Sequence, residues 1–229
     1  AFDYALKLAK EVDADLVLAT DPDADRLGVY AKDSATGEYM SFTGNMSGLL
    51  IAEYELSQRA AKGLLPADRA DGALVTTIVS SKMAYAIAAR YGLTVIEVLT
   101  GFKYIGEQIK LFEAALQANG GMPDHTKGAY EYECGYEESY GCLVGTHARD
   151  KDAVVAVMAL CEAAAYYKSL GMTLWDQMQE IYRQYGYYRE SLESITIPGA
   201  EGAEKIEAII AGLREHTPAV IGGSRVIAL

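Results

Sequence analysis

The stretch ALVTTIVSSKMAYAIAARYGLTVIEVL, residues 73–99, contains two apolar runs rich in β-branched residues with a helical segment between them. The runs ALVTTIV and LTVIEVL predict two strands, and residues 81–91 predict a helix with Ser80 or Ser81 as its N-cap. A second helix is predicted at about residues 104–116. Because strands alternate with helices, this stretch indicates an α/β unit whose sheet is at least partly parallel.

The segments on both sides of this unit extend the pattern. The predicted elements are a helix at 3–12, strands at 16–19, in LGVYAK and in EYMSF, a helix at about 45–62, a strand in AYEYECGYEES, a long helix in DKDAVVAVMALCEAAAYYKSLG, a helix at about 174–185 that stops at Gly186, and a short helix near 201–213. The predicted fold class is therefore α/β, with a mixed, partly parallel sheet that has helices on both faces.

Composition narrows the class of protein. The chain has 229 residues, 51% of them hydrophobic, which is enough for one large domain or two small ones. With 32 acidic and 20 basic residues the net charge is −12, so we expect no nucleic-acid partner and no anionic membrane surface. No signal peptide and no run of 18 apolar residues is found, which predicts a soluble protein.

The cysteines and the chain ends give two further expectations. Three cysteines without a CxxC pair indicate neither a disulfide framework nor a zinc site, which favours a reducing cytoplasm. The chain starts without Met inside a helical pattern and stops within the apolar run RVIAL, so both ends look cut.

Three aspartates alternate directly after the apolar run DLVLA. Asp21, Asp23 and Asp25 can aim their carboxylates at one point, and such hard oxygen ligands suit Mg²⁺ or Ca²⁺. A calcium EF-hand loop counted from Asp21 is excluded, because Arg26 and Lys32 stand where Gly and Glu are needed. A haloacid-dehalogenase-like phosphatase fits poorly, because that family has Thr or Val where Asp25 stands.

A solvated acidic turn is the alternative for these aspartates, since Asp is a common turn residue. Arg26 beside the triad favours a binding site instead, because it is placed to hold an anion shared with a metal ion. Phosphate is the obvious candidate for that anion.

The segment GYEESYG, residues 135–141, places Glu137 and Ser139 between glycines. A carboxylate and a hydroxyl on one loop can grip vicinal sugar hydroxyls, because the carboxylate accepts hydrogen bonds and the hydroxyl both donates and accepts. A Gly-bounded β-turn without a ligand is the alternative.

The segment THARDKDAV places Arg149 and Lys151 just before a predicted helix. Cations at a helix N-terminus oppose its dipole unless an anion binds there, so this placement hints at a phosphate pocket. The alternative is that Asp150 caps the helix and both cations are solvated.

Thr100, Gly101 and Lys103 lie between a predicted strand and a helix, where ligand loops occur in α/β sheets. The same residues also suit an ordinary helix start. His125, His147 and His216 are isolated in the sequence and show no metal or triad spacing.

In this order, TDPDADR, TGFK, EESYG and RDKD resemble motifs of the α-D-phosphohexomutase superfamily, the phosphoglucomutases and phosphomannomutases. The first motif is the most specific, because the metal loop of that family reads D-G/P-D-G/A-D-R after a strand. Enzymes of that family have four domains. The resemblance implies that residues 1–40 form the end of domain two with the metal loop, 41–186 the sugar-binding α/β domain three, and 187–229 the incomplete start of domain four.

The resemblance also implies a role for each candidate residue. Mg²⁺ is the implied cofactor, and a hexose phosphate is the implied substrate. Lys151 could exchange the hydroxyl proton if neighbouring cations such as Arg149 lower its pKa. The implied assignments are Asp21, Asp23 and Asp25 to the metal, Arg26 and Lys151 to catalysis, and Glu137, Ser139, Arg149, Thr100, Gly101 and Lys103 to substrate binding.

The implied activity is interconversion of hexose 1-phosphate and hexose 6-phosphate, with glucose, mannose or both, through a phosphoserine and a 1,6-bisphosphate. The chain lacks the family's serine loop, commonly T-A-S-H-N-P, and its R-x-S-G-T phosphate loop. We therefore expect the missing domains of a parent protein to be its partners and the isolated chain to be inactive. A non-catalytic sugar-phosphate or metal-binding module and a metal-dependent phosphatase are the alternatives.

Overall fold

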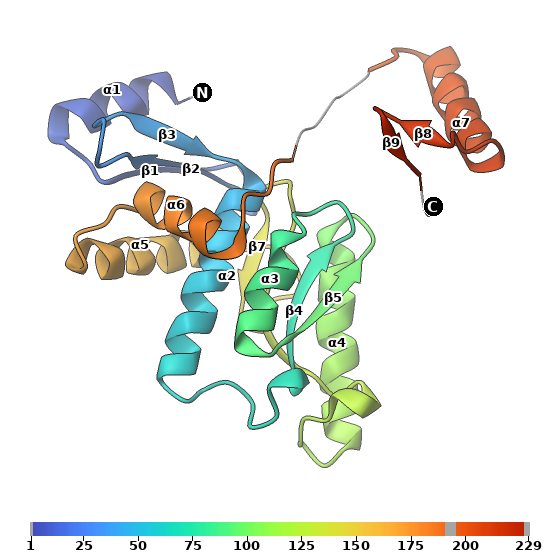
Figure 1. The fold of residues 1–229 in the computed structure, drawn as a ribbon, viewed down its shortest axis with the longest axis horizontal. Helices are drawn as coiled ribbons and strands as arrows, with labels where there is room; N and C mark the ends of the chain where they lie inside the picture. The colour runs from blue at the N-terminus through green and yellow to red at the C-terminus, as the bar shows by residue number, and fades with distance from the viewer. Residues whose placement is uncertain (1, 191–195, 227–229) are drawn as a thin grey trace. The chain divides into compact units, whose positions relative to one another are not determined.

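The computed structural model describes residues 2–190 and 196–226. The chain divides into two compact units, Ala1–Arg189 and Glu190–Leu229. The described part of the first unit contains a three-stranded sheet and a four-stranded sheet (Figure 1).

The three-stranded sheet is antiparallel, with strand order β1-β2-β3. It consists of β1 (Leu16–Thr20), β2 (Leu27–Lys32) and β3 (Tyr39–Phe42), and α1 (Asp3–Val12) precedes it. Alternate side chains of a strand face opposite sides of a sheet. Leu27, Val29 and Ala31 of β2 are accordingly buried, and they join the core formed with the helices of the larger sheet.

The four-stranded sheet has the order β5-β4-β6-β7. It consists of β4 (Gly72–Thr77), β5 (Thr94–Val98), β6 (Glu131–Tyr136) and β7 (Cys142–Val144). Strand β4 pairs in parallel with both β5 and β6, whereas β7 is antiparallel to β6. Every residue of β4 is buried, as expected for a parallel strand covered on both faces.

Helices cover both faces of this mixed sheet (Figure 1). On one face, Leu74 and Cys134 pack with α2 (Gly44–Ala61), α3 (Met83–Tyr91), α5 (Ala153–Ser169) and α6 (Leu174–Tyr185). On the other face, Ala73 and Val75 pack against α4 (Phe102–Ala118). The predicted fold class, a mixed and partly parallel sheet with helices on both faces, is confirmed.

The helix termini show where local sequence decides a boundary. Thr173 and Asp176 form a capping box at the start of α6, and that helix ends before Gly186, as predicted. The prediction of Ser80 or Ser81 as the N-cap of α3 is wrong, because the N-cap is Lys82. The hydroxyl of Ser80 instead contacts Thr77 and Glu138, whereas the Ser81 hydroxyl accepts from the Met83 N–H at 3.3 Å, one residue before the cap position.

The second unit is described by itself. It contains α7 (Ala200–Glu215), at the position of the predicted short helix, and a hairpin of β8 (Val220–Ile221) and β9 (Ser224–Arg225).

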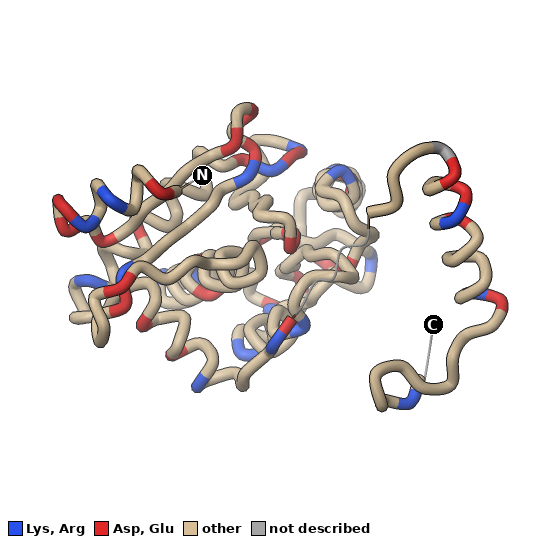
Figure 2. The backbone as a smooth tube through the Cα atoms, turned by 90° about the horizontal axis from the view of Figure 1, so that it is seen from above, with Lys and Arg blue, Asp and Glu red and all other residues tan. Residues whose placement is uncertain are grey.

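Lys and Arg positions are interspersed with Asp and Glu positions along the described backbone of the whole chain (Figure 2). In the described ranges no single helix is long and apolar enough to cross a membrane, although α5 and α6 together, bent by 84°, have the length and composition of a broken span.

Candidate active site

Three loop segments that are far apart in the sequence meet in the first unit. The aspartate loop, residues 21–26, connects β1 to β2. The EES loop, residues 137–141, connects β6 to β7 at the carboxyl end of β6. The RDKD segment, residues 149–152, leads into α5. In open α/β sheets, ligands bind outside the carboxyl ends of the parallel strands, so this is the expected place for a site.

Backbone contacts hold the three segments together. Arg26 and Gly141 form an isolated antiparallel bridge between the aspartate loop and the EES loop. Next to it, the Leu27 N–H donates to the Tyr140 carbonyl at 3.2 Å. The Ala153 N–H at the start of α5 donates to the Ala24 carbonyl at 3.0 Å, which joins the aspartate loop to the RDKD segment.

The aspartate loop is a tight turn organised around the Asp21 carboxylate. Asp21 Oδ1 accepts from the backbone N–H groups of Asp25 at 3.1 Å and Arg26 at 3.0 Å, and Oδ2 accepts from Arg26 Nε at 2.7 Å. The turn requires Ala24 to adopt a left-handed conformation with φ of 56°. The Arg26 N–H, followed by the Arg26 side chain and the Asp25 N–H, lowers the pKa of Asp21 to about 2, so this carboxylate is charged at neutral pH.

The three carboxylates fit a divalent cation. One oxygen each from Asp21, Asp23 and Asp25 lies within 4.8 Å of the others. Asp25 Oδ1 is buried and has no hydrogen-bond partner among the described residues, and its ion-pair contact to Arg26 Nε is 3.5 Å long. Three hard oxygens, one of them buried and unsatisfied, are the donor set that Mg²⁺ or Ca²⁺ takes.

Lys151 links the RDKD segment to both other loops. Its Nζ lies 2.6 Å from Asp25 Oδ2, and its side chain is only 17% exposed. A Cβ at Gly141 would lie 2.5 Å from Lys151 Cδ and 2.9 Å from Glu137 Oε1. Any side chain at position 141 would therefore overlap the lysine stem and the Glu137 carboxylate.

The charge state of Lys151 differs from the one considered from the sequence. Burial acts to lower its pKa, but the hydrogen bond to Asp25 and the charges of Asp150 and Asp25 outweigh that effect and raise it. The neighbouring cation considered from the sequence is also directed elsewhere, because the Arg149 guanidinium pairs with Glu113 of α4. Lys151 is therefore a stable ammonium group in this structure.

Glu137 and Ser139 lie together beside Lys151. Glu137 is 5% exposed, and this burial raises the pKa of its carboxyl group, against the opposing effects of the Ser139 hydrogen bond and the Lys151 charge. The structure thus brings Glu137 and Ser139 to the same place as Lys151 and the aspartate loop.

The remaining candidates contact other groups. The Arg149 guanidinium donates to the Thr146 carbonyl at 2.7 Å as well as pairing with Glu113, so it is directed toward α4. Thr100, Gly101 and Lys103 lie after β5, which is separated from β6 by β4. Gly101, with φ of 120°, is the N-cap of α4, and Lys103 Nζ lies 4.8 Å from the centre of the Tyr104 ring.

Sequence reasoning missed Glu138, the neighbour of Glu137. Its Oε2 accepts from Thr77 Oγ1 at 2.9 Å and from Ser80 Oγ at 3.3 Å. The available signal was Thr77 in the run ALVTTIV and Ser80 directly after it, since the carboxyl ends of neighbouring parallel strands lie at the same edge of a sheet.

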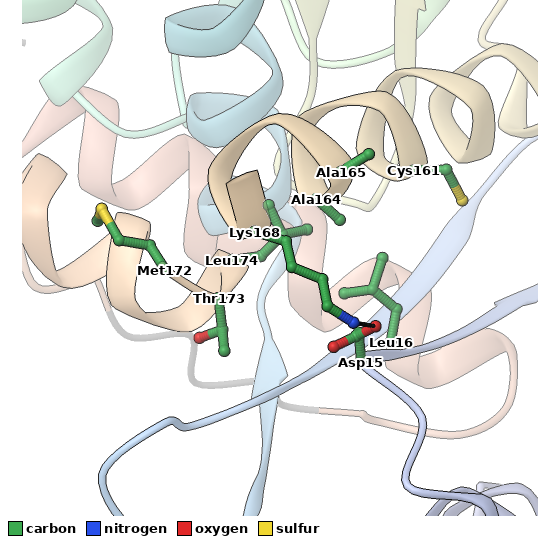
Figure 3. Close-up of a pocket in the computed structure, with 9 residues that line it drawn as sticks. All are labelled: Asp15, Leu16, Cys161, Ala164, Ala165, Lys168, Met172, Thr173 and Leu174. Carbon is green, nitrogen blue, oxygen red and sulfur yellow. Dashed lines mark hydrogen bonds and ion pairs between the residues drawn. The ribbon is translucent and has the colours of Figure 1, made fainter. Parts of the chain in front are cut away.

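Two hollows lie near these elements. One, of about 570 Å³, adjoins the aspartate loop and is lined in part by Asp21, Arg26 and Tyr140. A second, of about 360 Å³, is lined by residues of β1, α5 and the start of α6, with Lys168 Nζ 2.6 Å from Asp15 Oδ2 (Figure 3). The first hollow opens beside Arg26, which could hold a phosphoryl anion, whereas Lys168 of the second is paired with Asp15.

Comparison with solved structures identifies the class of fold. A structure from Thermus thermophilus described as a phosphomannomutase superposes with a TM-score of 0.56 at 23% sequence identity, covering 81% of this chain and 34% of the other. At that identity the likeness shows a shared fold: this is an α/β domain of the kind found in that sugar-phosphate mutase.

Sequence comparison identifies the family. The family model described as "Phosphoglucomutase/phosphomannomutase, alpha/beta/alpha domain III" matches residues 43–185, more than half of the chain. Phosphoglucomutases of Staphylococcus epidermidis and Staphylococcus aureus (strain N315) are 37% and 36% identical to it over all 229 residues. The chain belongs to the phosphoglucomutase/phosphomannomutase family, and it spans 38% of the length of these relatives.

Proposed function

We propose that this chain carries the metal loop and the sugar-recognition loop of a Mg²⁺-dependent phosphohexomutase. The parent enzyme interconverts hexose 1-phosphate and hexose 6-phosphate, with glucose, mannose or both as the sugar, through a phosphoserine and a 1,6-bisphosphate. The observation that carries this proposal is the position of Lys151, which contacts Asp25 and packs over Gly141 beside Glu137. Metal, phosphoryl and sugar groups can thus share one site.

We further propose the domain assignment expected from the sequence. Residues 1–40 are the end of domain two, 41–186 are domain three, and 187–229 are the start of domain four. The family match over residues 43–185 and the division of the chain after Arg189 support these boundaries.

We also propose a reducing, cytoplasmic setting, which the free thiols Cys134, Cys142 and Cys161 support.

Phosphoryl transfer needs alignment and neutralisation of charge more than covalent chemistry from the protein. Asp21, Asp23 and Asp25 would hold Mg²⁺, which when bound supplies Lewis-acid stabilisation of phosphoryl oxygens. Arg26 keeps its Nε on Asp21 while its side chain is 53% exposed, so the guanidinium can donate to a phosphoryl group without leaving the loop.

Proton transfer is assigned to Lys151, and sugar binding is assigned to the EES loop. Lys151 Nζ would donate its proton to a sugar oxygen and take it back in the reverse direction. Glu137 accepts hydrogen bonds from ring hydroxyls, and Ser139 donates or accepts beside it. Arg149, Thr100, Gly101 and Lys103 remain proposed substrate contacts that would need the substrate to reach toward α4.

The test compares the longer protein that contains this chain with the chain alone. We expect the longer protein to convert glucose 1-phosphate to glucose 6-phosphate in the presence of Mg²⁺ and the chain alone to give no turnover above a mock preparation. Lys151→Met should lower kcat in the longer protein, because the methionine fills similar space without a proton. Turnover by the chain alone would contradict its predicted inactivity. Release of inorganic phosphate without isomerisation would instead indicate a phosphatase.

A further inference from the structure

Two consecutive glutamates of the EES loop are directed to different neighbours. Glu137 lies beside Ser139, Gly141 and Lys151, where the proposed substrate binds. Glu138 is directed to β4, where its Oε2 meets the hydroxyls of Thr77 and Ser80. The two glutamate side chains therefore point in different directions, Glu137 toward the proposed site and Glu138 toward the sheet.

The hydroxyls that hold Glu138 are buried. Thr77 is 0% exposed and Ser80 is 4% exposed, and their oxygens lie 2.8 Å apart. Buried hydroxyls require hydrogen-bond partners, and hydrogen bonds to a charged acceptor are stronger than neutral ones. Because both hydroxyls converge on one carboxylate oxygen, the Glu138 side chain is fixed at the carboxyl end of β4.

The backbone of the same loop rests on the start of α2. A Cβ at Gly44 would lie 2.1 Å from the Glu138 carbonyl oxygen and 2.6 Å from the Tyr140 nitrogen, so the loop backbone touches the helix. Tyr140 adopts a φ of 72°, a left-handed conformation that a bulky residue rarely takes. Such strain persists only where the surroundings fix the loop, and the Glu138 side chain is one of the contacts that do so.

We propose that Glu138 is a positioning residue for sugar-phosphate recognition, which rests on the function proposed above. Its bonds to Thr77 and Ser80 set the orientation of the EES loop and thereby place Glu137 and Ser139 against the sugar. Without this anchor the side chains between Tyr136 and Gly141 lose a fixed contact to β4, and Glu137 loses its place beside Lys151. The aspartate loop has its own hydrogen bonds within residues 21–26, so metal binding does not depend on Glu138.

The experiment uses Glu138→Ala, Glu138→Gln, Thr77→Val and the Ala/Val double variant in the longer protein. Glu138→Ala should lower kcat/KM for glucose 1-phosphate by about 10- to 100-fold, mainly through a higher KM, with an unchanged Mg²⁺ activation constant. Glu138→Gln keeps an acceptor oxygen and should recover part of the loss. The double variant should be no worse than Glu138→Ala, because both changes remove the same bond. Glu180→Ala, on the exposed surface of α6, is the matched control.

A second readout uses the chain itself. Hydrogen exchange of a peptide covering residues 137–141 should be faster in Glu138→Ala than in wild type, while exchange in residues 21–26 is unchanged. The proposal is overturned if the longer protein is active and Glu138→Ala keeps its kcat/KM, or if exchange of the loop does not change. If the wild-type longer protein has no mutase activity, the proposed function fails, and the exchange measurement still decides whether Glu138 anchors the loop.

Discussion

The two ends of the mixed sheet use polar residues in different ways. At the amino end, His125 donates its backbone N–H to Asp71 Oδ1 at 2.7 Å, its ring Nδ1 lies 2.7 Å from the same oxygen, and Asp124 pairs with Lys127 at 2.9 Å. At the carboxyl end, Asp25 Oδ1 is buried without a hydrogen-bond partner in the described part of the chain. The Asp71 carboxylate thus accepts hydrogen bonds from the His125 loop, whereas the Asp25 carboxylate keeps one oxygen without a hydrogen bond.

The largest effect is expected from Asp25→Asn. It removes the carboxylate that is shared between the proposed metal and Lys151, so kcat of the longer protein should fall by at least about 100-fold at saturating Mg²⁺. Steady-state glucose 1-phosphate kinetics at several Mg²⁺ concentrations measure this. Asp13→Asn is the matched control, because its side chain is 83% exposed and Asn tolerates the left-handed conformation at the end of α1. Equal activity of the two variants would contradict the proposed metal site.

Gly141→Ala should have the next largest effect. The added methyl group would overlap Lys151 Cδ and the Glu137 carboxylate, so both side chains must move and kcat/KM should fall by about 10- to 100-fold. Gly212→Ala on α7 is the control, because apart from the adjoining backbone of its own helix no heavy atom lies within 4 Å of the added Cβ. Circular dichroism and thermal melting of the chain check that both variants fold. A Gly141→Ala protein with wild-type kcat/KM would show that the close packing is unimportant for the reaction.

The smallest effect concerns stability at the amino end of the sheet. The hydrogen bond to Asp71 raises the pKa of His125 above its ordinary value of 6.5. A raised pKa stabilises the folded state fully below the unfolded value, and this contribution is lost as pH rises through the folded value. Wild type should therefore melt above His125→Gln by about 2 °C or less at pH 6, and the difference should shrink toward pH 9.

His216→Gln, in the second unit, is the control for that pH dependence. Thermal melting of the chain between pH 6 and pH 9 measures both variants against wild type. A difference that grows with pH would have the wrong sign for a histidine whose pKa is raised in the folded state, and it would exclude the Asp71 bond as the cause.

Local signals in the sequence were sufficient for most elements of the fold. The bounds of α6 follow from an apolar helical face, a capping box and a terminal glycine, all of which are local. The N-cap of α3 could not be predicted in the same way, because the Ser80 hydroxyl is used by Glu138, which is 58 residues away in the sequence. A long-range contact overrode a local preference at that position.

The site was predictable in residue types but not in arrangement. Acidic residues that alternate after a strand indicate a metal loop, and the structure places the three carboxylates within 4.8 Å of one another. The pairing of Arg149 with Glu113 leaves no trace in sequence spacing, because it depends on how α4 packs beside the RDKD segment. The roles of Glu137, Ser139, Arg149 and the residues at 100–103 remain predictions.

The bridge between Arg26 and Gly141 has a mechanical consequence. Together with the bond from Leu27 to Tyr140, it joins the antiparallel sheet to the mixed sheet through backbone atoms, and the bond from Ala153 to Ala24 joins the aspartate loop to α5. A change of angle between the two sheets would break these bonds beside the proposed catalytic groups. In the wild-type protein, with Glu138 bound to β4, the proposed metal loop and the proposed sugar loop should therefore move together when a substrate enters or leaves.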